Sequence, residues 1–393
     1  MAGERKGLIV VLAGTGINLA FGVLYAWSIF GNYLSGTLGW TKAQASLPYT
    51  IAISMFALMM IPAGKLQDRF GPRWVATAGG VLTGLGLFLA GFFPTIPGLI
   101  VCFGVLAGSG IGLGYASTTP AAVKWFPPER KGLITGIVVG GFGLASIYIA
   151  PLSNYLLARF GAFDSFRILG VAFLFVTVIL AQFVQNPPVK PGVNLYVKAS
   201  RDMGSRQMLK TAYFWKLWFM FFAGATGGLM IIGHLSKIAA LQLGGNVGFI
   251  LVALAAIANA LGRPVAGVVS DKVGRGVTMG ALYLLQGATL FFFPYLNTFV
   301  TLLAGAMLVY FAYGSMLSVY PSACADAYGT KKLGQNYGIL FSAWGAGGVF
   351  GPLLGGFIAD ATGSYAFAMK IAAGILALAA FIAFTLKPFR PEA

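Results

Sequence analysis

The sequence predicts an all-α membrane protein in which twelve transmembrane helices form two pseudo-symmetric six-helix bundles. Three observations lead to this fold class. Hydrophobic residues make up 58% of the 393-residue chain and charged residues only 9%, whereas a water-soluble protein needs about a quarter of charged residues to cover its surface. Twelve apolar runs are each long enough, at about 20 residues, to cross a bilayer. A short pattern after the second run recurs after the eighth.

The apolar runs follow one another with only short polar turns between most of them. The first run lacks a small-residue cleavage site, so we interpret it as a true span and not as a removable signal. The runs cover residues 8–34, 46–66, 75–95, 98–120, 133–157, 166–185, 212–234, 247–269, 278–296, 299–320, 335–359 and 365–386. Little of the chain is left for a soluble domain.

The basic residues orient these spans. The net charge is +17, but the charge falls in alternate loops and not in one nucleic-acid-binding patch. The poorer side has only Lys42, Arg159, Arg167 and Lys237. Basic loops stay in the cytoplasm, so both termini are expected there. We predict a monomeric, multi-pass protein of the cell (inner) membrane. We expect it to contact the lipid bilayer and not to bind nucleic acid.

The widest polar gap divides the spans into six and six. It runs from Asn186 to Thr211, is basic and contains three prolines. We therefore predict an N-terminal bundle at 1–185, a cytoplasmic loop at 186–211 and a C-terminal bundle at 212–393. Internal repetition supports this division, because Gly64, Asp68, Arg69 and Gly71 match Gly267, Asp271, Lys272 and Gly274.

The repeated pattern resembles the loop signature of the major facilitator superfamily. It reads GKLQDRFGPR at 64–73 and GVVSDKVGRG at 267–276. The resemblance implies a substrate site between two bundles and alternating access to it. An aspartate beside a helix terminus and an arginine on the neighbouring loop could also latch the cytoplasmic side. The alternative is a plain topology-setting turn.

Enzymatic chemistry is not expected. The chain has one histidine, and its nine acidic residues lie in loops, at helix ends or in tails. It therefore offers no nucleophile with a base, no paired carboxylates and no metal-ligand cluster within the spans. Cys102 and Cys324 lie in or beside apolar runs and are interpreted as packing residues. We expect no catalytic residues, no cofactor and no metal.

Arg263 is the strongest candidate for substrate binding. It is the only charge in the eighth run, and at ~1.5 Å per residue it lies about 12 Å inside Asp271, near the middle of a ~30 Å hydrocarbon layer. An arginine there costs roughly 2.5–3.5 kcal/mol, so we expect it to face a wet cavity or an anion. A guanidinium can bind a carboxylate through two parallel N–H bonds. The alternative is a structural arginine held by backbone carbonyls.

Two neighbours strengthen the case for Arg263. Pro264 removes a helix hydrogen bond and frees the carbonyl of Ala260, as in a helix that lines a cavity. Asn259 lies one turn before Arg263 on the same face, where it could bind the ligand or orient the guanidinium. Glycines at 132, 136 and 140 also recur at helical spacing, which permits close helix packing.

Four stretches of the chain resemble the oxalate:formate antiporter family and bacterial monocarboxylate (lactate/pyruvate) transporters. They read GLGYASTTPAAVKWFP, GLMIIGHLSKIA, ANALGRPVAGVVSDKVGR and NYGILFSAWGAGGVFGP. The resemblance implies a small organic anion held by Arg263 beneath aromatic side chains, for which it indicates Tyr115, Tyr313 and Phe341. Ordinary packing is the alternative for each aromatic residue.

Two departures from these relatives narrow the expected substrate. The oxalate exchanger uses a lysine in the eleventh span, where residues 341–345 here read FSAWG. Animal monocarboxylate porters have an aspartate four residues before the arginine, where this chain has Asn259. One buried positive charge without a buried negative charge matches a monoanion such as lactate, pyruvate, acetate or formate.

We therefore predict a secondary transporter of small monocarboxylates that works by proton symport. The proton could travel with the carboxylate or through His234, near the outer end of the seventh span, although His234 as a polar cap is an equal alternative. Anion exchange is the second hypothesis. A non-transporting membrane receptor is the third, and the short loops argue against it.

Overall fold

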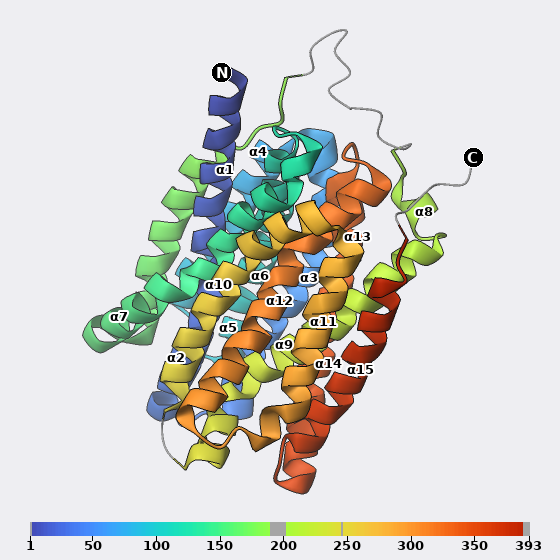
Figure 1. The fold of residues 1–393 in the computed structure, drawn as a ribbon. Coiled ribbons are helices and arrows are strands. Elements are labelled where there is room, and N and C mark those ends of the chain that lie inside the picture. The colour runs from blue at the N-terminus through green and yellow to red at the C-terminus, as the bar shows by residue number, and fades with distance from the viewer. Residues whose placement is uncertain (1, 189–201, 245–246, 388–393) are drawn as a thin grey trace. The chain divides into compact units, whose positions relative to one another are not determined.

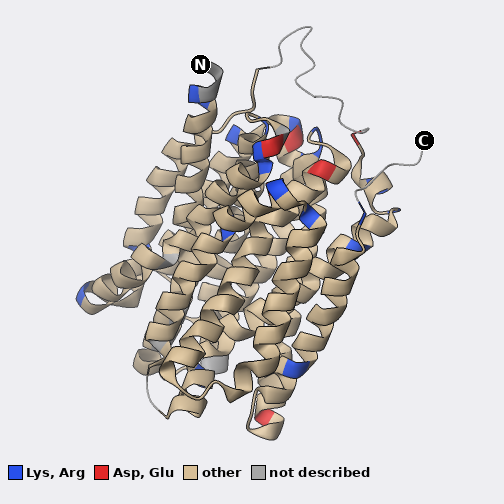
Figure 2. Ribbon diagram, viewed as in Figure 1, with Lys and Arg blue, Asp and Glu red and all other residues tan. Residues whose placement is uncertain are grey.

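The computed structural model describes residues 2–188, 202–244 and 247–387, and all regular secondary structure within these ranges is helical. The predicted central loop at 186–211 therefore lies partly outside the described residues. Long apolar stretches of helix carry no charged residue, and the charges gather toward helix ends (Figure 2).

The chain divides into two compact units by its internal contacts. Unit 1 comprises Met1–Pro127, Gly141–Ala199 and Thr330–Ile339, and unit 2 comprises Pro128–Gly140, Ser200–Gly329 and Leu340–Ala393. Each unit thus contains a short segment from the opposite half of the sequence. The predicted bundles at 1–185 and 212–393 differ from these units only by such segments and by the linker, and as rigid bundles they stay a prediction.

Unit 1 begins with a span made of α1 (Ala2–Phe21), η1 (Gly22–Ala26) and α2 (Trp27–Leu38). It continues with α3 (Lys42–Phe70), α4 (Pro72–Ala90), α5 (Ile96–Leu99), the π-helical η2 (Ile100–Ala107) and α6 (Gly108–Val123). Within this unit α6 packs against α1, α3 and α4 (Figure 1). Thr41 starts α3 with a capping box to Gln44, which satisfies backbone N–H groups that a helix start leaves without partners.

Helix α7 (Lys131–Ala181) follows the short η3 (Pro128–Arg130) and belongs to both units. Its 51 residues are interrupted at Gly161, where φ is 72°. At ~1.5 Å per residue this length is more than twice a ~30 Å hydrocarbon layer. The described residues contain eleven helical stretches that are long and apolar enough to span. Because α7 supplies two crossings, the predicted twelve transmembrane helices are confirmed.

Unit 2 contains α8 (Ser205–Met208), α9 (Ala212–Leu243), α10 (Gly248–Val273), α11 (Arg275–Phe292), η4 (Phe293–Tyr295) and α12 (Phe299–Tyr328). After α13 (Leu333–Leu340), which lies almost entirely in unit 1, it is completed by α14 (Ser342–Thr362) and α15 (Ala366–Phe384). The principal pairs are α10 with α12, α9 with α14, and α11 with α15 (Figure 1).

The two signature turns need glycine for a conformational reason. Gly71 links α3 to α4 at φ 88° and ψ 157°, and Gly274 links α10 to α11 at φ 95° and ψ 154°. A side chain at such a positive φ would collide with its own backbone. The repeated glycine in the sequence pattern therefore corresponds to the same backbone turn in each half.

Candidate functional site

The first signature turn holds the start of α13 within unit 1. Asp68 Oδ2 accepts a hydrogen bond from the Gln335 backbone N–H at 2.9 Å, and Gln67 Nε2 donates to Asp68 Oδ1 at 2.5 Å. A Cβ added at Gly64 would lie 1.9 Å from the Gly334 carbonyl oxygen, so the two backbones touch. Asp68 is therefore an N-terminal cap for a helix far away in sequence, where the helix dipole favours a negative charge.

The basic residues around this turn have different surroundings. Lys124 is close enough to Asp68 to interact with it electrostatically; burial lowers the pKa of Lys124, and the charge of Asp68 opposes that shift. Arg69 is exposed and lies over the ring of Phe70, 5.1 Å from its centroid. Within unit 1, Asp68 and not Arg69 makes the latch-like contact.

The second signature turn repeats this arrangement within unit 2. Asp271 accepts backbone N–H bonds from Gly132 at 3.0 Å and Leu133 at 3.1 Å, at the start of α7. A Cβ added at Gly267 would lie 2.2 Å from the Gly132 carbonyl oxygen. Lys272 is exposed. The matching positions of the two sequence repeats thus have the same function of capping a helix start.

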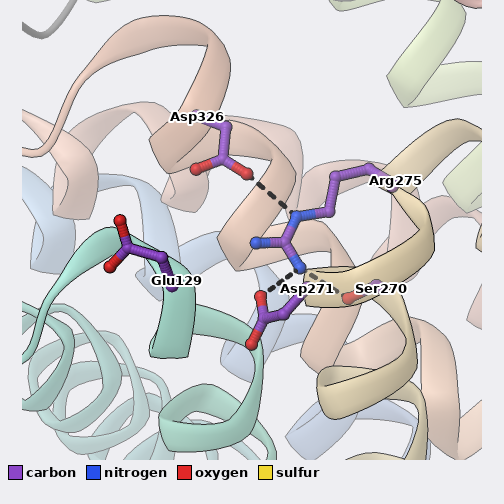
Figure 3. Close-up of a pocket in the computed structure, with 6 residues that line it drawn as sticks. Glu129, Ser270, Asp271, Arg275 and Asp326 are labelled. Carbon is purple, nitrogen blue, oxygen red and sulfur yellow. Dashed lines mark hydrogen bonds and ion pairs between the residues drawn. The ribbon is translucent and has the colours of Figure 1, made fainter.

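Unit 2 adds an ion-pair network to its cap. Arg275 lies between Asp271, at 2.7 Å, and Asp326, at 2.9 Å, and it also donates to Ser270 (Figure 3). Lys131 reaches Asp326 at 2.9 Å. The network borders an open pocket of about 310 Å³ that is lined by Glu129, Ser270, Asp271, Gly274, Arg275 and Asp326. Sequence reasoning did not single out Asp326, because a carboxylate near a helix end is common and its partners are distant in sequence.

Arg263 lies on α10 and is fully buried, with 0% of its surface exposed. Its Nε and Nη2 donate to Asn259 Oδ1 at 3.2 and 3.0 Å. Its Nη1 donates to the carbonyl oxygen of Val139 on α7, in the part of that helix that belongs to unit 2. Both acceptors are neutral, so they solvate the guanidinium without cancelling its charge. The expected pairing of Asn259 with Arg263 along one helix face is present.

The backbone around Arg263 is fixed by α12. Ser315 Oγ donates to the Gly262 carbonyl at 3.0 Å, and Ser318 Oγ donates to the Arg263 carbonyl at 2.7 Å. A Cβ added at Gly314 would lie 2.2 Å from the Asn259 carbonyl oxygen. Helix α10 continues through Pro264. The side chain of Arg263 is therefore presented from a firmly packed backbone.

Two of the three predicted aromatic residues meet in unit 2 through a tryptophan. Trp344 Nε1 donates to the Tyr313 hydroxyl at 2.8 Å, and its ring stacks on Phe341 with centroids 4.9 Å apart. The third, Tyr115, lies in unit 1 against Phe56 and Phe142. Trp344 was considered in the sequence only as a position without lysine, because a tryptophan in an apolar span carries no signal of its contacts.

His234 on α9 is held by two polar neighbours within unit 2. Its Nε2 is 2.9 Å from the Pro352 carbonyl oxygen and its Nδ1 is 3.2 Å from the Tyr365 hydroxyl. A carbonyl oxygen can only accept a hydrogen bond, so Nε2 carries the proton in this arrangement. Nδ1 of the neutral ring then accepts a hydrogen bond from the Tyr365 hydroxyl. The imidazole is therefore fixed in one orientation between α14 and the start of α15.

A family model described as the Major Facilitator Superfamily matches residues 8–253 and 240–393. The chain belongs to this superfamily. It is therefore a multi-pass secondary transporter of the membrane and not an enzyme, as the signature turns predict.

The similarity to other proteins extends over almost the whole of this chain. The oxalate:formate antiporter of Oxalobacter formigenes is 29% identical over 396 residues, which cover 98% of this chain and 93% of that protein. Monocarboxylate transporter 13 of Bos taurus is 26% identical over 385 residues, which cover 94% and 87%. The major facilitator transporter FucP of E. coli, in its outward conformation, has a TM-score of 0.74 at 16% identity, with 96% and 99% covered. The structural likeness confirms the fold.

The glycines at 136 and 140 give a matched pair of substitutions on α7. A Cβ at Gly136 would lie 2.6 Å from the Arg263 carbonyl oxygen and 2.7 Å from Pro264 Cα, whereas a Cβ at Gly140 has no heavy atom within 4 Å. Overpacking against backbone costs roughly 1–3 kcal/mol. We expect Gly136→Ala to lower the thermal unfolding midpoint of the purified protein and Gly140→Ala to leave it unchanged or raised. Equal midpoints for the two variants would contradict the close approach of α7 to α10.

Proposed function

We propose that this transporter moves small monocarboxylates, of the lactate and pyruvate type, together with a proton, and that Arg263 binds the carboxylate. The observation that supports this most is a fully buried guanidinium that donates to two neutral groups, the Asn259 amide oxygen and the Val139 carbonyl. Such a charge is costly in an apolar environment, and an anion relieves that cost. The named activities of the two relatives, oxalate:formate exchange and monocarboxylate transport, both concern small organic anions.

Charge counting favours a substrate with one carboxylate. Asp68, Asp271 and Asp326 lie at helix ends and are engaged there, and Asp164 pairs with Arg167 just after the break of α7 at Gly161. The stretch 341–345, in which a second cation is expected for a dianion, instead contains Trp344, which stacks on Phe341 and donates to Tyr313. We propose Tyr313 and Phe341 as apolar contacts of the substrate in unit 2, and Tyr115 as a candidate contact in unit 1.

Alternating access is proposed to involve the bundles at 1–185 and 212–393, with the loop at 186–211 between them. The two aspartate caps support this proposal, because Asp68 and Asp271 each hold the start of an apolar span, Leu333–Thr362 and Lys131–Ala181 respectively, that continues from one unit into the other. Breaking and remaking such caps is the proposed gating step, since each cap consists of a few charge-assisted hydrogen bonds. Gly64, Arg69, Gly71 and Lys272 are proposed to complete the two gating turns.

Arg263→Lys tests the carboxylate ligand directly. Lysine keeps the charge but loses the two parallel N–H donors, and one charge-assisted hydrogen bond is worth about 1.5–3 kcal/mol. We expect the apparent affinity for lactate in proteoliposome uptake to fall about ten- to a hundred-fold. Arg159→Lys is the matched control, because Arg159 is exposed, and its affinity should not change. An unchanged affinity in Arg263→Lys would refute the assigned role.

A pH gradient separates symport from exchange. For symport, labelled lactate or pyruvate should enter vesicles faster when the outside is acidic, because the proton gradient then drives uptake. Exchange is the second candidate, favoured by the oxalate:formate relative, and it would require anion on the opposite side and show no such stimulation. No flux of any small carboxylate under either condition would contradict both activities.

His234→Gln tests the proposed proton route. Glutamine can still hydrogen-bond to the Pro352 carbonyl and Tyr365 but does not titrate. If His234 carries the proton, the variant should keep lactate counterflow and lose stimulation by an acidic exterior. Stimulation as large as in the unsubstituted protein would show instead that His234 is a polar cap and that the proton travels by another path.

A further inference from the structure

The first ten residues of α7, Lys131–Gly140, are held along α10 and α12 within unit 2 by polar contacts at several points. The start of the segment is capped by Asp271. The Thr135 and Ser322 hydroxyl oxygens are 3.3 Å apart in a buried contact. We call this segment the α7 arm. Beyond Gly140 the same helix belongs to unit 1, so the arm is the part of α7 that packs within unit 2.

The α7 arm approaches α10 backbone to backbone. A Cβ added at Gly132 would lie 2.3 Å from the Gly267 carbonyl oxygen, and one at Gly136 would lie 2.6 Å from that of Arg263. Glycines allow such an approach because they have no side chain to separate the helices. The packing of the arm on α10 therefore depends on close backbone contact, and displacing any part of the arm weakens it.

Arg263 itself contacts the arm near its end. Its Nη1 donates to Val139, which precedes the final residue of the arm. Asn259 Oδ1 meanwhile occupies the edge of the guanidinium formed by Nε and Nη2. A carboxylate that binds with two parallel bonds needs two neighbouring nitrogens. With Asn259 in place, a carboxylate would use the edge formed by Nη1 and Nη2. Nη1, which carries two N–H groups, would then face both the carboxylate and the Val139 carbonyl.

We propose that the substrate carboxylate takes Arg263 Nη1 from the Val139 carbonyl and thereby loosens the α7 arm from unit 2. This inference rests on the proposed role of Arg263 as carboxylate ligand. A charge-assisted bond to a carboxylate is roughly twice as strong as one to a neutral carbonyl, so the exchange favours the bound state. The Val139 carbonyl loses its hydrogen bond to Arg263 only when a carboxylate takes its place at Nη1. Occupancy of the site is in this way linked to freedom of the helix that joins the two units.

Cross-linking across the arm tests the inference. Thr135→Cys and Ser322→Cys are introduced together into protein in which Cys102 and Cys324 are replaced by alanine. We expect saturating lactate to slow disulfide formation about fivefold or more, in the range typical of coupled sites. The same pair combined with Arg263→Gln should form its disulfide at a rate that lactate does not change.

A second measurement does not depend on the geometry of a disulfide. Thr135 is buried, so the single variant Thr135→Cys should react slowly with a membrane-permeant maleimide, and faster with lactate present. Thr177→Cys is the matched control, because Thr177 is a buried threonine near the other end of α7, and lactate should not change its labelling. Adding Gly136→Ala to Thr135→Cys should raise labelling without lactate.

The outcomes separate this inference from the function on which it rests. If the parent protein takes up lactate but lactate changes neither the cross-linking nor the labelling of residue 135, the arm is not released by substrate and the inference is wrong. If the parent protein takes up no small carboxylate, the proposed function fails and the inference fails with it. Slower cross-linking with lactate that depends on Arg263 supports both.

Discussion

The buried charge of Arg263 is the constraint to which much of unit 2 responds. An ionised side chain in an apolar helix must be solvated by the protein, and here Asn259 and the Val139 carbonyl provide that solvation. Both hydrogen bonds depend on glycines in neighbouring helices, since Gly314 lets α12 approach Asn259 and Gly136 lets α7 approach Arg263. The serines of α12 then fix the α10 backbone. Packing and electrostatics are therefore inseparable at this site.

The two signature turns use the same physical device, an aspartate cap, with different support in each unit. In unit 1 the capping aspartate has Gln67 and Lys124 nearby. In unit 2 the cap belongs to an ion-pair network with Arg275 and Asp326. Asp326 is 40% exposed, and exposed pairs contribute little, about 0–1 kcal/mol. The strength of the second cap therefore comes mainly from the nearly buried Asp271 and its backbone bonds, and the network orients them.

Sequence reasoning predicted features that residue types and their spacing determine. The apolar runs gave the twelve spans, and the four-residue interval predicted the contact between Asn259 and Arg263. It could not predict the Val139 carbonyl as a partner, because every residue has the same backbone acceptor. The sequence also did not predict that the arm belongs to unit 2 and residues 330–339 to unit 1. These assignments depend on where the helices pack and not on which residues they contain. The contact of Trp344 with Tyr313 belongs to the same class.

The two aspartate caps also impose an order on the maturation of the chain. When α10 leaves the ribosome, the α7 residues that Asp271 caps have already been synthesised. Asp68 instead bonds to Gln335, 267 residues further along, so its partner appears only when the chain is nearly complete. Unit 1 is therefore begun first but is complete only after most of unit 2 has been synthesised, and until Gln335 arrives Asp68 must be satisfied by water, lipid head groups or the insertion machinery. Truncation after α12 would leave it in that immature state.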